Sequence, residues 1–585
     1  MIIFLLGSVA ISQNTQDSSK ISIAKKALTK GINLISRDPS DSVGNEESSE
    51  RFEEFTGKII RNIYVENAGF ESSIYGSQRE IIRKFGLFVN KLHHNTREKT
   101  IRQHLFIKSG DPLNPYEIGD NERYLRQLDF ILESRIVATS IEGTNFVDLT
   151  IVTRDVFSIG ADLGGSIPSA PRFSVFDANL DGGGQQLRVD LLIDGDRTPK
   201  VGYGVSFRKS SLWGSLANLE LAYSQLNTGL GMGEETEYAY YMLLERPLVS
   251  PYSRLAGGLE LSQNWSQNVY SKPDSAFLDY KYNVFDFWMG YNFGVKKDIQ
   301  NRMREFLAVR FYDGSFIDSP DQEEYNRPNL YRSQSGVLAE YTIYKKNYFK
   351  TRYVYGFGRT EDQPYGYSFA VTAGYIEWAS KKRPYLAAKA NYSKVNESGS
   401  FYEGNFNLGS FFESGNAEDI VIQSDINYFT PALSLNRFKL RGESYFSYTA
   451  VFNQKLNDFL DINSNYVSGL RVNYLQANRR YSTKIGGSLY TPWSIFGFRL
   501  APFADFELAG LLCNTCVAKN LTYYGISSGI RTRNENLIFG TMEIKFTYVP
   551  KDEIGDPKFR IKFRQNLRIS DKKVFVKAPG MIRYN

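Results

Sequence analysis

The chain has 585 residues, enough for more than one domain, and a formal net charge of +6. Its mean hydropathy is −0.37, and no run of about 18 apolar residues is present, which excludes a helical membrane protein. Lysine and arginine are spread along the chain instead of forming one block, so nucleic-acid binding is not indicated. Aromatic residues make up 15% of the chain, and a tyrosine-rich composition suits the two rims of a lipid-facing β-barrel.

The first part of the chain predicts no folded domain. Residues 1–13 are mainly apolar and resemble the core of a secretory signal, although the basic leading segment is missing. Residues 14–56 are rich in serine, aspartate, glutamate and lysine without a convincing period. We expect this stretch to be a flexible polar spacer.

Residues 57–154 predict a small α+β domain with the element order strand, helix, helix, strand, strand. The alternation over 59–65 predicts the first strand. Asn95 precedes Glu98 by three residues, which is the spacing of a capping box, and predicts the start of the first helix.

The second helix of this domain is predicted to follow a turn at Gly110 and Asp111. Apolar residues at helical spacing, Leu125 among them, predict that the helix packs one face on a core. Two strands are then expected, over 134–141 and 146–154.

From residue 155 to 570, strands and turns dominate, and apolar and polar side chains alternate with the period of a β-strand. In the last predicted strand, 557–570, Phe559, Ile561 and Phe563 alternate with basic residues. One apolar face can pack on a second sheet, as in a soluble sandwich, or can face lipid around a wet lumen. Because the alternation recurs along the whole stretch, a membrane barrel is the better interpretation. Nineteen strand candidates can be marked, the first of them over 155–167.

The run from Leu105 to Ile136, LFIKSGDPLNPYEIGDNERYLRQLDFILESRI, resembles the central part of a POTRA domain. This is the periplasmic module of the BamA/TamA superfamily of outer-membrane proteins. The resemblance covers the turn at Gly110 and Asp111, the helix around Leu125 and the following strand. Only one such unit is visible, whereas the well-studied assembly factors carry several.

Three further phrases resemble the bacterial surface antigen β-barrel of the same superfamily. They are EDQPYG at 361–366, the strand pair over 479–506 and the closing strands over 521–546. The resemblance implies a mainly β chain: a transmembrane antiparallel β-barrel of about 16 strands, spanning 155–570 and preceded by the POTRA-like domain.

The superfamily carries a Val-Arg-Gly-aromatic motif in its long sixth loop, with an arginine that reaches into the barrel. The counterpart here is Gly469, Leu470 and Arg471, although the next residues depart from the motif. A rival match stands at 440–442, at the end of the preceding strand. An ordinary loop arginine is the alternative for Arg471.

The resemblance also implies a seam between the first and last barrel strands that pairs poorly and can open. Glycines at Gly160, Gly164 and Gly165 would loosen the first strand. Phe559, Ile561 and Phe563 would form the apolar face of the last strand. The tail, 571–585, is expected to fold back into the barrel mouth; alternatively, Phe575 and Val576 extend the sheet.

Motifs for covalent chemistry are weak in this sequence. The string Gly525-Ile-Ser-Ser-Gly529 fits a nucleophile elbow, but it lies inside an alternating strand and not at a strand-to-helix turn. The histidines at 93, 94 and 104 lack the companions of a metal site. The pair Cys513 and Cys516 is expected in a loop, as a local disulfide or as two idle thiols. We expect no enzyme activity, no cofactor and no metal.

The resemblance implies a function in the assembly, insertion or translocation of proteins at a bacterial outer membrane, by strand templating at the seam. The partners would be the lipid bilayer, unfolded outer-membrane protein clients and accessory factors of the periplasm or of the lipoprotein class, with the POTRA-like domain in the periplasm. The alternatives are a passive or ligand-selective channel and a structural surface receptor on the same scaffold.

Overall fold

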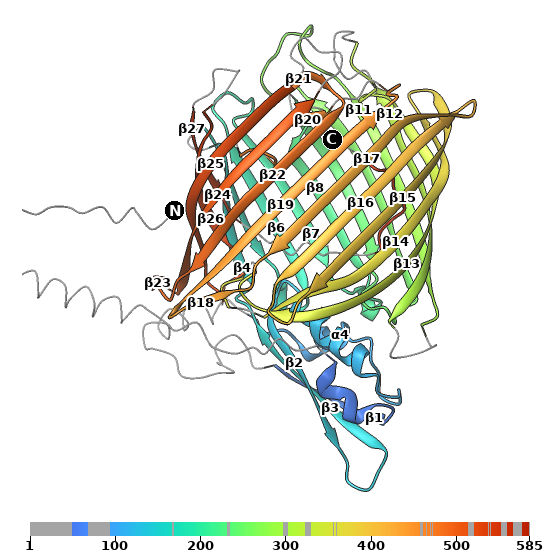
Figure 1. Ribbon diagram of the computed structural model, residues 1–585, viewed down its shortest axis with the longest axis vertical. Coiled ribbons are helices and arrows are strands. Elements are labelled where there is room, and N and C mark those ends of the chain that lie inside the picture. Colours follow the sequence, from blue (N-terminus) through green and yellow to red (C-terminus); the bar gives the residue numbers. More distant parts are fainter. Residues whose placement is uncertain are drawn as a thin grey trace, which may run out of the picture.

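The computed structural model describes a small α+β domain and a large β-barrel (Figure 1). The described residues are 49–67, 94–166, 169–230, 235–295, 302–321, 329–354, 356–358, 360–456, 460–463, 465–468, 470, 472–495, 497–512, 520–535, 537–538, 540–550, 558–565 and 576–583. In this part of the chain, no helix combines the length and apolar character needed to cross a membrane. The predicted stretches 1–13 and 14–48, the pair Cys513 and Cys516, and Phe575 lie outside the described residues.

The small domain has its elements in the order predicted from the sequence. They are the 3-10 helix η1 (Glu50–Phe55), β1 (Ile59–Asn67), α3 (Glu98–Arg102), α4 (Pro115–Arg126), β2 (Ile131–Ser140) and β3 (Phe146–Asp155). The sheet order is β1-β3-β2, with β1 parallel and β2 antiparallel to the central strand β3. The helices bury Ile118 and Leu125 completely against this sheet.

Two boundaries of the small domain differ from the prediction. The expected spacer 14–56 is wrong over its last residues, because Phe52 of η1 is 2% exposed and belongs to the domain core. The expected capping box at Asn95 is also wrong. Helix α3 has Arg97 at its N-cap without a side-chain cap, whereas α4 is capped by Asn114, which accepts from the backbone N–H of Tyr116.

The barrel is a ring of twenty main antiparallel strands in the described part of the chain, so the expected number of about 16 is wrong. The strands are β4 (Ile159–Ser166), β5 (Ala170–Asp177), β6 (Gln185–Ile193), β7 (Val201–Lys209), β8 (Asn218–Thr228), β9 (Thr236–Arg246), β10 (Leu255–Gln267), β11 (Lys281–Phe293), β12 (Met303–Asp318), β13 (Gln334–Thr351), β14 (Glu361–Trp378), β15 (Lys381–Val395), β16 (Phe401–Glu413), β17 (Asn416–Phe429), β19 (Phe438–Phe452), β22 (Arg479–Tyr490), β24 (Phe498–Leu512), β25 (Asn520–Arg533), β26 (Met542–Tyr548) and β27 (Phe559–Arg564). The short strands β18 (Leu433–Leu435) and β23 (Ser494–Ile495) pair antiparallel with β19 and β24, while β20 (Leu460–Ile462) pairs with β21 (Val472–Ala477) in a connection.

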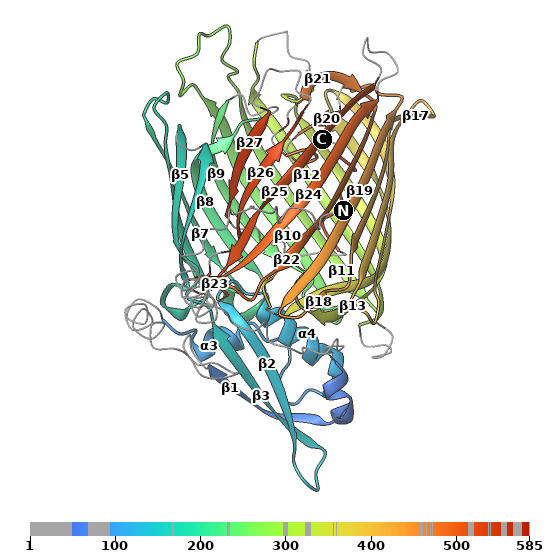
Figure 2. The same ribbon diagram turned by 60° about the vertical axis from the view of Figure 1, so that its left-hand side comes forward.

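The small domain lies below one end of the barrel, with α4 directly under the strands (Figures 1 and 2). We call this the near end and the opposite end the far end. Because β3 ends at Asp155 and β4 begins at Ile159, the first strand leaves the near end, and even-numbered strands up to β16 do the same.

The alternation places apolar residues outside and polar residues inside, as β11 illustrates. Phe285, Phe287 and Met289 are 42%, 44% and 58% exposed on the outer face. Asp286, between them, points inward and forms an ion pair with Arg310 of β12. The barrel therefore has an apolar exterior and a polar, hydrogen-bonded lumen, as a lipid-facing barrel requires.

Aromatic residues gather in a row on the outer face toward the far end. The ring centroids of Tyr203 and Tyr223 are 5.7 Å apart, those of Tyr223 and Tyr240 5.0 Å, and those of Tyr240 and Trp265 5.6 Å. Such a girdle is typical of the level where a lipid-facing band ends and headgroups begin.

Candidate functional site

The ring closes between its first strand, β4, and its last strand, β27 (Figure 2). β4 pairs with β5 over eight residues and β27 pairs with β26 over six. β27 and β4 are hydrogen-bonded neighbours that close the ring. We call this junction the seam.

Gln565 bridges the seam with its side-chain amide. Its Oε1 accepts from the backbone N–H of Leu163 at 3.0 Å, and its Nε2 donates to the backbone carbonyl of Ala161 at 2.6 Å. Both backbone groups belong to β4. A primary amide thus offers β4 the donor and acceptor that a peptide group of a neighbouring strand would offer.

The three seam glycines differ in their surroundings, and the loosening of β4 by Gly160, Gly164 and Gly165 stays a prediction. A Cβ at Gly160 would lie 2.3 Å from the ring of Phe176 and 2.8 Å from Ile538, so this glycine admits close packing. Gly165 has a φ of +79° near the turn to β5, where other residues would be strained. Only Gly164 has open space around it.

The near end of the seam is held by the turn after β25 and not by β27. Phe157 forms a parallel bridge with Leu537. The next residue, Ile538, is buried in a cluster with Val156 and Phe176. The bridging amide of Gln565 therefore stands above a packed apolar contact.

The outer face of β27 is the most open part of the wall beside the seam. Phe559 and Ile561 are 76% and 74% exposed, compared with 50% for Phe546 on the neighbouring strand β26. Phe563 is partly buried. A short strand with such an uncovered apolar face is suited to contact another strand.

The connection between β19 and β22 enters the lumen at residues 465–468 and at Leu470. Val467 and Leu470 are 0% and 1% exposed and belong to a buried cluster on the inner wall. Ser468 donates its backbone N–H and its hydroxyl to the carboxylate of Glu507, at 2.8 and 3.1 Å. We call residues 465–468 together with Leu470 the loop segment.

Of the predicted loop motif, Leu470 is thus buried in the lumen, whereas Gly469 and Arg471 lie outside the described residues. The rival arginine, Arg441, lies on β19 toward the near end of the barrel. It donates hydrogen bonds to the backbone carbonyls of Arg352 and Gly399.

Ion pairs link neighbouring strands of the inner wall next to the loop segment. Lys545 of β26 lies 2.6 Å from Glu507 and 3.2 Å from Asp505 of β24. Lys484 of β22 contacts Glu443 at 3.0 Å. Buried charges are costly unless paired, and this network pairs both cations.

Helix α4 is fixed to the near-end turns of the barrel by buried ion pairs. Arg126 forms a two-point contact with Asp362 of β14, at 2.7 and 3.0 Å. Glu122 lies 2.9 Å from Lys350 of β13. Asp120 contacts Arg302, 2.9 Å away, before β12.

Glu122 and Arg126 of α4 also bind backbone groups along part of the free edge of β2. Glu122 accepts from the backbone N–H of Ile136 at 2.8 Å, and Arg126 donates to the carbonyl of Ser134 at 3.0 Å. Burial favours a higher pKa for Glu122, but Arg126, Lys350, Arg51 and this backbone hydrogen bond outweigh it and lower the pKa to about 2.

The predicted turn at Gly110 and Asp111 lies against the start of β1. Gly110 has a φ of +91° and donates its N–H to the carbonyl of Ile60. Ile60 in turn donates to the carbonyl of Asp111 at 3.0 Å. This turn therefore covers the outer edge of β1, while Leu125 stays in the core.

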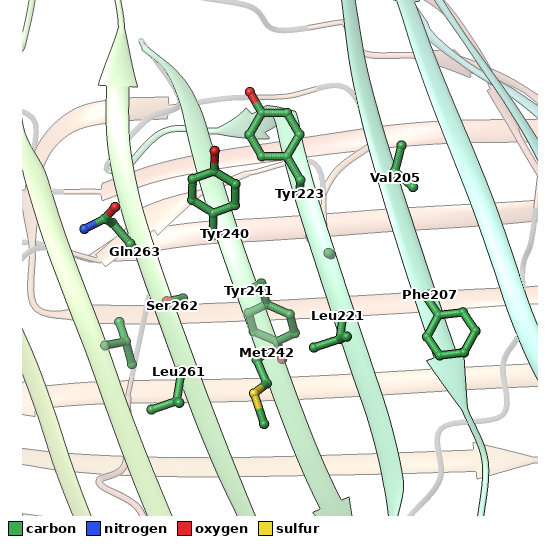
Figure 3. A pocket seen from close by; sticks show the side chains of 12 residues that line it. Val205, Phe207, Leu221, Tyr223, Tyr240, Tyr241, Met242, Leu261, Ser262 and Gln263 are labelled. Carbon is green, nitrogen blue, oxygen red and sulfur yellow. The ribbon is translucent and has the colours of Figure 1, made fainter.

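A pocket of about 690 Å³ opens between β7 and β11, on the outer face of the barrel. In Figure 3, Tyr223 and Tyr240 lie side by side above Leu221 and Met242. Leu221 and Tyr240 are 42% and 56% exposed. The pocket is a furrow in the apolar outer surface of the barrel.

The string at 525–529 lies within β25, as expected for a structural role. The hydroxyls of Ser527 and Thr547 are 2.9 Å apart on the inner wall. A Cβ at Gly529 would lie 2.1 Å from the carbonyl of Ile544 on the next strand. The glycine there permits close strand packing.

Sequence reasoning missed both Gln565 and the ion pairs of α4. Gln565 follows the alternating run of β27, and nothing in the run distinguishes it from a strand residue. In the sequence of α4 the charged residues look like an ordinary solvated face, and only the structure shows that Asp120, Glu122, Arg123 and Arg126 are all more than nine-tenths buried. Charged side chains are almost never fully buried unless they are paired, so this burial indicates partners outside the helix.

The chain is similar to BamA and to CdiB. Solved structures that match it are BamA from Haemophilus ducreyi lacking POTRA domains 1–3, with 10% identity, coverage of 86% of this chain and 84% of that chain, and a TM-score of 0.33. CdiB from Acinetobacter baumannii has 11% identity, coverage of 93% and 96%, and a TM-score of 0.43. CdiB from Escherichia coli has 9% identity, coverage of 95% and 99%, and a TM-score of 0.40.

The likeness to BamA that the motifs predicted is thus found among solved structures. No family model and no curated protein matches the chain. With TM-scores below 0.5, these similarities leave the function to be derived from the chain's own contacts.

Proposed function

We propose that this chain assembles, inserts or translocates proteins at a bacterial outer membrane, by templating strands at the seam and without covalent chemistry. The single observation that carries the proposal is the contact of Gln565 with Ala161 and Leu163. The strands that meet there are short, since β4 pairs with β5 over eight residues and β27 pairs with β26 over six.

The membrane part of the proposal is supported by the outer surface. Lipid contains no water to satisfy backbone groups, so a sheet within it has to close on itself. The apolar outer residues of β11 and the aromatic row from Tyr203 to Trp265 fit a lipid-facing band with one rim at the far end.

Opening the seam would separate β27 from its hydrogen-bonded neighbour β4. The two side-chain hydrogen bonds of Gln565 would break, with a net contribution of about 1 kcal/mol each. The N–H of Leu163 and the carbonyl of Ala161 would then be free to pair with an incoming client strand. Each further client strand would pair with the strand added before it, so its backbone N–H and C=O groups would form hydrogen bonds as it enters the membrane.

A passive channel is the less favoured function, because the described lumen holds ordered chain. The loop segment packs Val467 and Leu470 on the inner wall, and Glu507 binds its backbone. The network around Lys545 stiffens the wall behind it. A structural surface receptor would need neither the bridged seam nor the fixed α4.

The small domain would act as a POTRA-like periplasmic unit that presents clients to the near end. Its edge strand β2 is partly closed by Glu122 and Arg126 at Ser134–Ile136. Client strands would therefore add along the remaining edge of β2, beyond Ile136, where Val137 is 45% exposed.

Proteoliposomes test this proposal. The purified full chain is reconstituted into phosphatidylcholine vesicles, and an unfolded eight-stranded outer-membrane β-barrel is added. We expect protease-protected, folded client to accumulate at least tenfold faster than in empty vesicles. Equal rates in both kinds of vesicle would contradict insertion by this chain.

Bilayer conductance distinguishes the channel. Steady conductance of the untreated protein, together with unaided client folding, would support a channel instead. A matched control uses vesicles that contain a folded outer-membrane barrel of similar size without a bridged seam, which corrects for defects at any protein–lipid boundary.

A further inference from the structure

Residues 576–583 lie inside the barrel, against the inner wall, and we call them the tail segment. Val576 is 3% exposed and packs in a cluster with Phe306 and Tyr344. Ile582 is 9% exposed and packs in the cluster that contains Tyr385. The expectation that the tail folds back into the barrel agrees with these contacts, whereas Val576 does not extend the sheet.

The tail segment runs lengthwise through the lumen. Phe306 is the fourth residue of β12, close to the near end, and contacts the beginning of the segment. Tyr385 is the fifth residue of β15, which starts at the far end, and contacts its later part. The segment therefore passes from the near half of the lumen to the far half.

The wall binds the main chain of the tail segment through three side chains. Arg310 donates to the carbonyl of Pro579 at 3.0 Å, and its guanidinium is held in place by Asp286. The backbone N–H of Ile582 donates to the hydroxyl of Tyr385 at 2.8 Å. Gln423 donates to the carbonyl of Arg583 at 2.6 Å.

Hydrogen bonds to main-chain groups do not depend on the side chains of the bound segment. The wall adds two aliphatic contacts, at Val576 and Ile582, several residues apart. A Cβ at Gly409 would lie 3.1 Å from Ile582 and 2.5 Å from the Tyr385 hydroxyl, so this glycine makes room for both. These features suit a polypeptide segment with spaced aliphatic residues.

We propose that the inner wall of β12–β17 is a binding site for irregular client polypeptide, and that the tail segment occupies it as an internal competitor. The tail has to leave before a client segment can lie along the same wall. This inference rests on the proposed function for the identity of the competing ligand. The site itself does not depend on it.

Displacement of the tail would also be felt by the loop segment. Ile582, Val467 and Leu470 belong to the same buried apolar cluster. Losing Ile582 from that cluster removes packing from the side of the lumen where Glu507 holds Ser468. Client entry and movement of the loop segment would therefore be coupled.

The test uses the full chain with residues 576–585 deleted. A fluorescent synthetic peptide of residues 574–585 is titrated onto the detergent-solubilised variant, with anisotropy as the readout. We expect saturable binding, and at least tenfold weaker binding of a peptide carrying Val576→Asp and Ile582→Asp. In planar bilayers the deletion variant should show larger and more persistent conductance than the full chain.

Point variants separate the site from general damage. Tyr385→Phe in the deletion background should weaken peptide binding roughly fivefold, since one main-chain hydrogen bond is lost. Tyr445→Phe is the matched control, because the hydroxyl of Tyr445 bonds Asp425 and not the tail. Equal losses in the two variants would overturn the assignment of Tyr385.

Competition tests the client part of the proposal. An unfolded outer-membrane β-barrel should displace the peptide, and a soluble folded protein should not. Absence of peptide binding together with unchanged conductance would overturn the site. Peptide binding that the unfolded client does not reduce would overturn the client assignment alone, and failure of the vesicle insertion assay would leave the binding result standing.

Discussion

Gln565 and Leu163 face each other across the seam, where the side-chain carbonyl of Gln565 accepts a 3.0 Å hydrogen bond from the backbone N–H of Leu163. The same amide donates to Ala161. One side chain therefore makes two hydrogen bonds to the strand β4 at the junction that closes the ring. Its removal should loosen β4 while the rest of the wall keeps its pairing.

The first prediction concerns Gln565→Ala. We expect amide hydrogen exchange at Leu163 to become about five- to tenfold faster, since one hydrogen bond of about 1 kcal/mol is lost. Gln263→Ala is the control, because the amide of Gln263 bonds the side chain of Asn283 on the outer face. Unchanged exchange at Leu163 would show that Gln565 does not hold the seam.

The second prediction concerns the junction between α4 and the barrel. Asp362→Asn leaves Arg126 with Glu122 and Glu133 but weakens its two-point contact, at a cost of about 1.5–3 kcal/mol for hydrogen bonds to a charged group. Spin labels on the exposed residues Thr139 and Ser434 should then report a broader distance distribution between domain and barrel.

The control for that variant is Glu413→Gln, which breaks the exposed far-end pair with Lys381. Exposed pairs contribute about 0–1 kcal/mol, so the label distances should stay as in the unchanged chain. A distribution that remains narrow in Asp362→Asn would contradict a fixed small domain.

The third prediction is an acid sensitivity of the small domain through His104. Burial lowers the pKa of His104 to about 4, although its hydrogen bond with the Thr100 carbonyl acts in the opposite direction. A neutral buried histidine stabilises the fold above its unfolded pKa of about 6.5, and this stability is lost as the pH falls from 6.5 through 4. The loss is on the order of 3 kcal/mol.

The variant His104→Gln should therefore flatten the fall in domain stability between pH 6.5 and 4, measured by urea unfolding. The contribution of Glu117 to the free energy of unfolding changes with pH in the opposite direction in this window, because burial and the carboxylates of Asp120 and Asp111 raise its pKa to about 7. Its folded form keeps a proton that the unfolded form releases, so its contribution declines as the pH rises from about 4.5 to 7. If the difference in unfolding free energy between the unchanged chain and His104→Gln does not vary with pH, the role of His104 is contradicted.

The fourth prediction concerns the anchor of the loop segment. Glu507→Gln weakens the acceptor of Ser468 and leaves Lys545 with Asp505 alone. We expect added protease to cleave at 465–468 more than threefold faster from the far side, as a charge-assisted hydrogen bond is lost. Glu443→Gln, which alters a lumen carboxylate that pairs with Lys484, should leave the cleavage rate unchanged.

Alternation in the sequence was sufficient to predict which residues of most strands face outward, because the period of two is a property of each strand by itself. Strand β5 was missed, since Pro171 and the short run before Asp177 interrupt the pattern. The strand number was wrong for a different reason. The value of about 16 came from the resemblance, whereas nineteen candidates in the residues were closer to the twenty strands found.

Contacts between distant segments were beyond what the sequence could predict. The pairing of Gln565 with β4 joins residues about four hundred positions apart, and Arg126 meets Asp362 across 236 positions. Neither residue differs in local pattern from its neighbours. The burial of Leu470 and the path of the tail segment likewise depend on the shape of the closed lumen.

The most direct measurement of the central claim is client insertion with a reversibly closed seam. Ala161 and Gln565 are changed to cysteine, with Cys513→Ser and Cys516→Ser in the background, and joined by a short cleavable bis-methanethiosulfonate. The control joins Leu221→Cys to Met242→Cys, which stand opposite each other in the register of β8 and β9. The account predicts that closing the seam stops client insertion in vesicles, that reduction restores it, and that the control link has no effect. Insertion at an undiminished rate through the closed seam would contradict it.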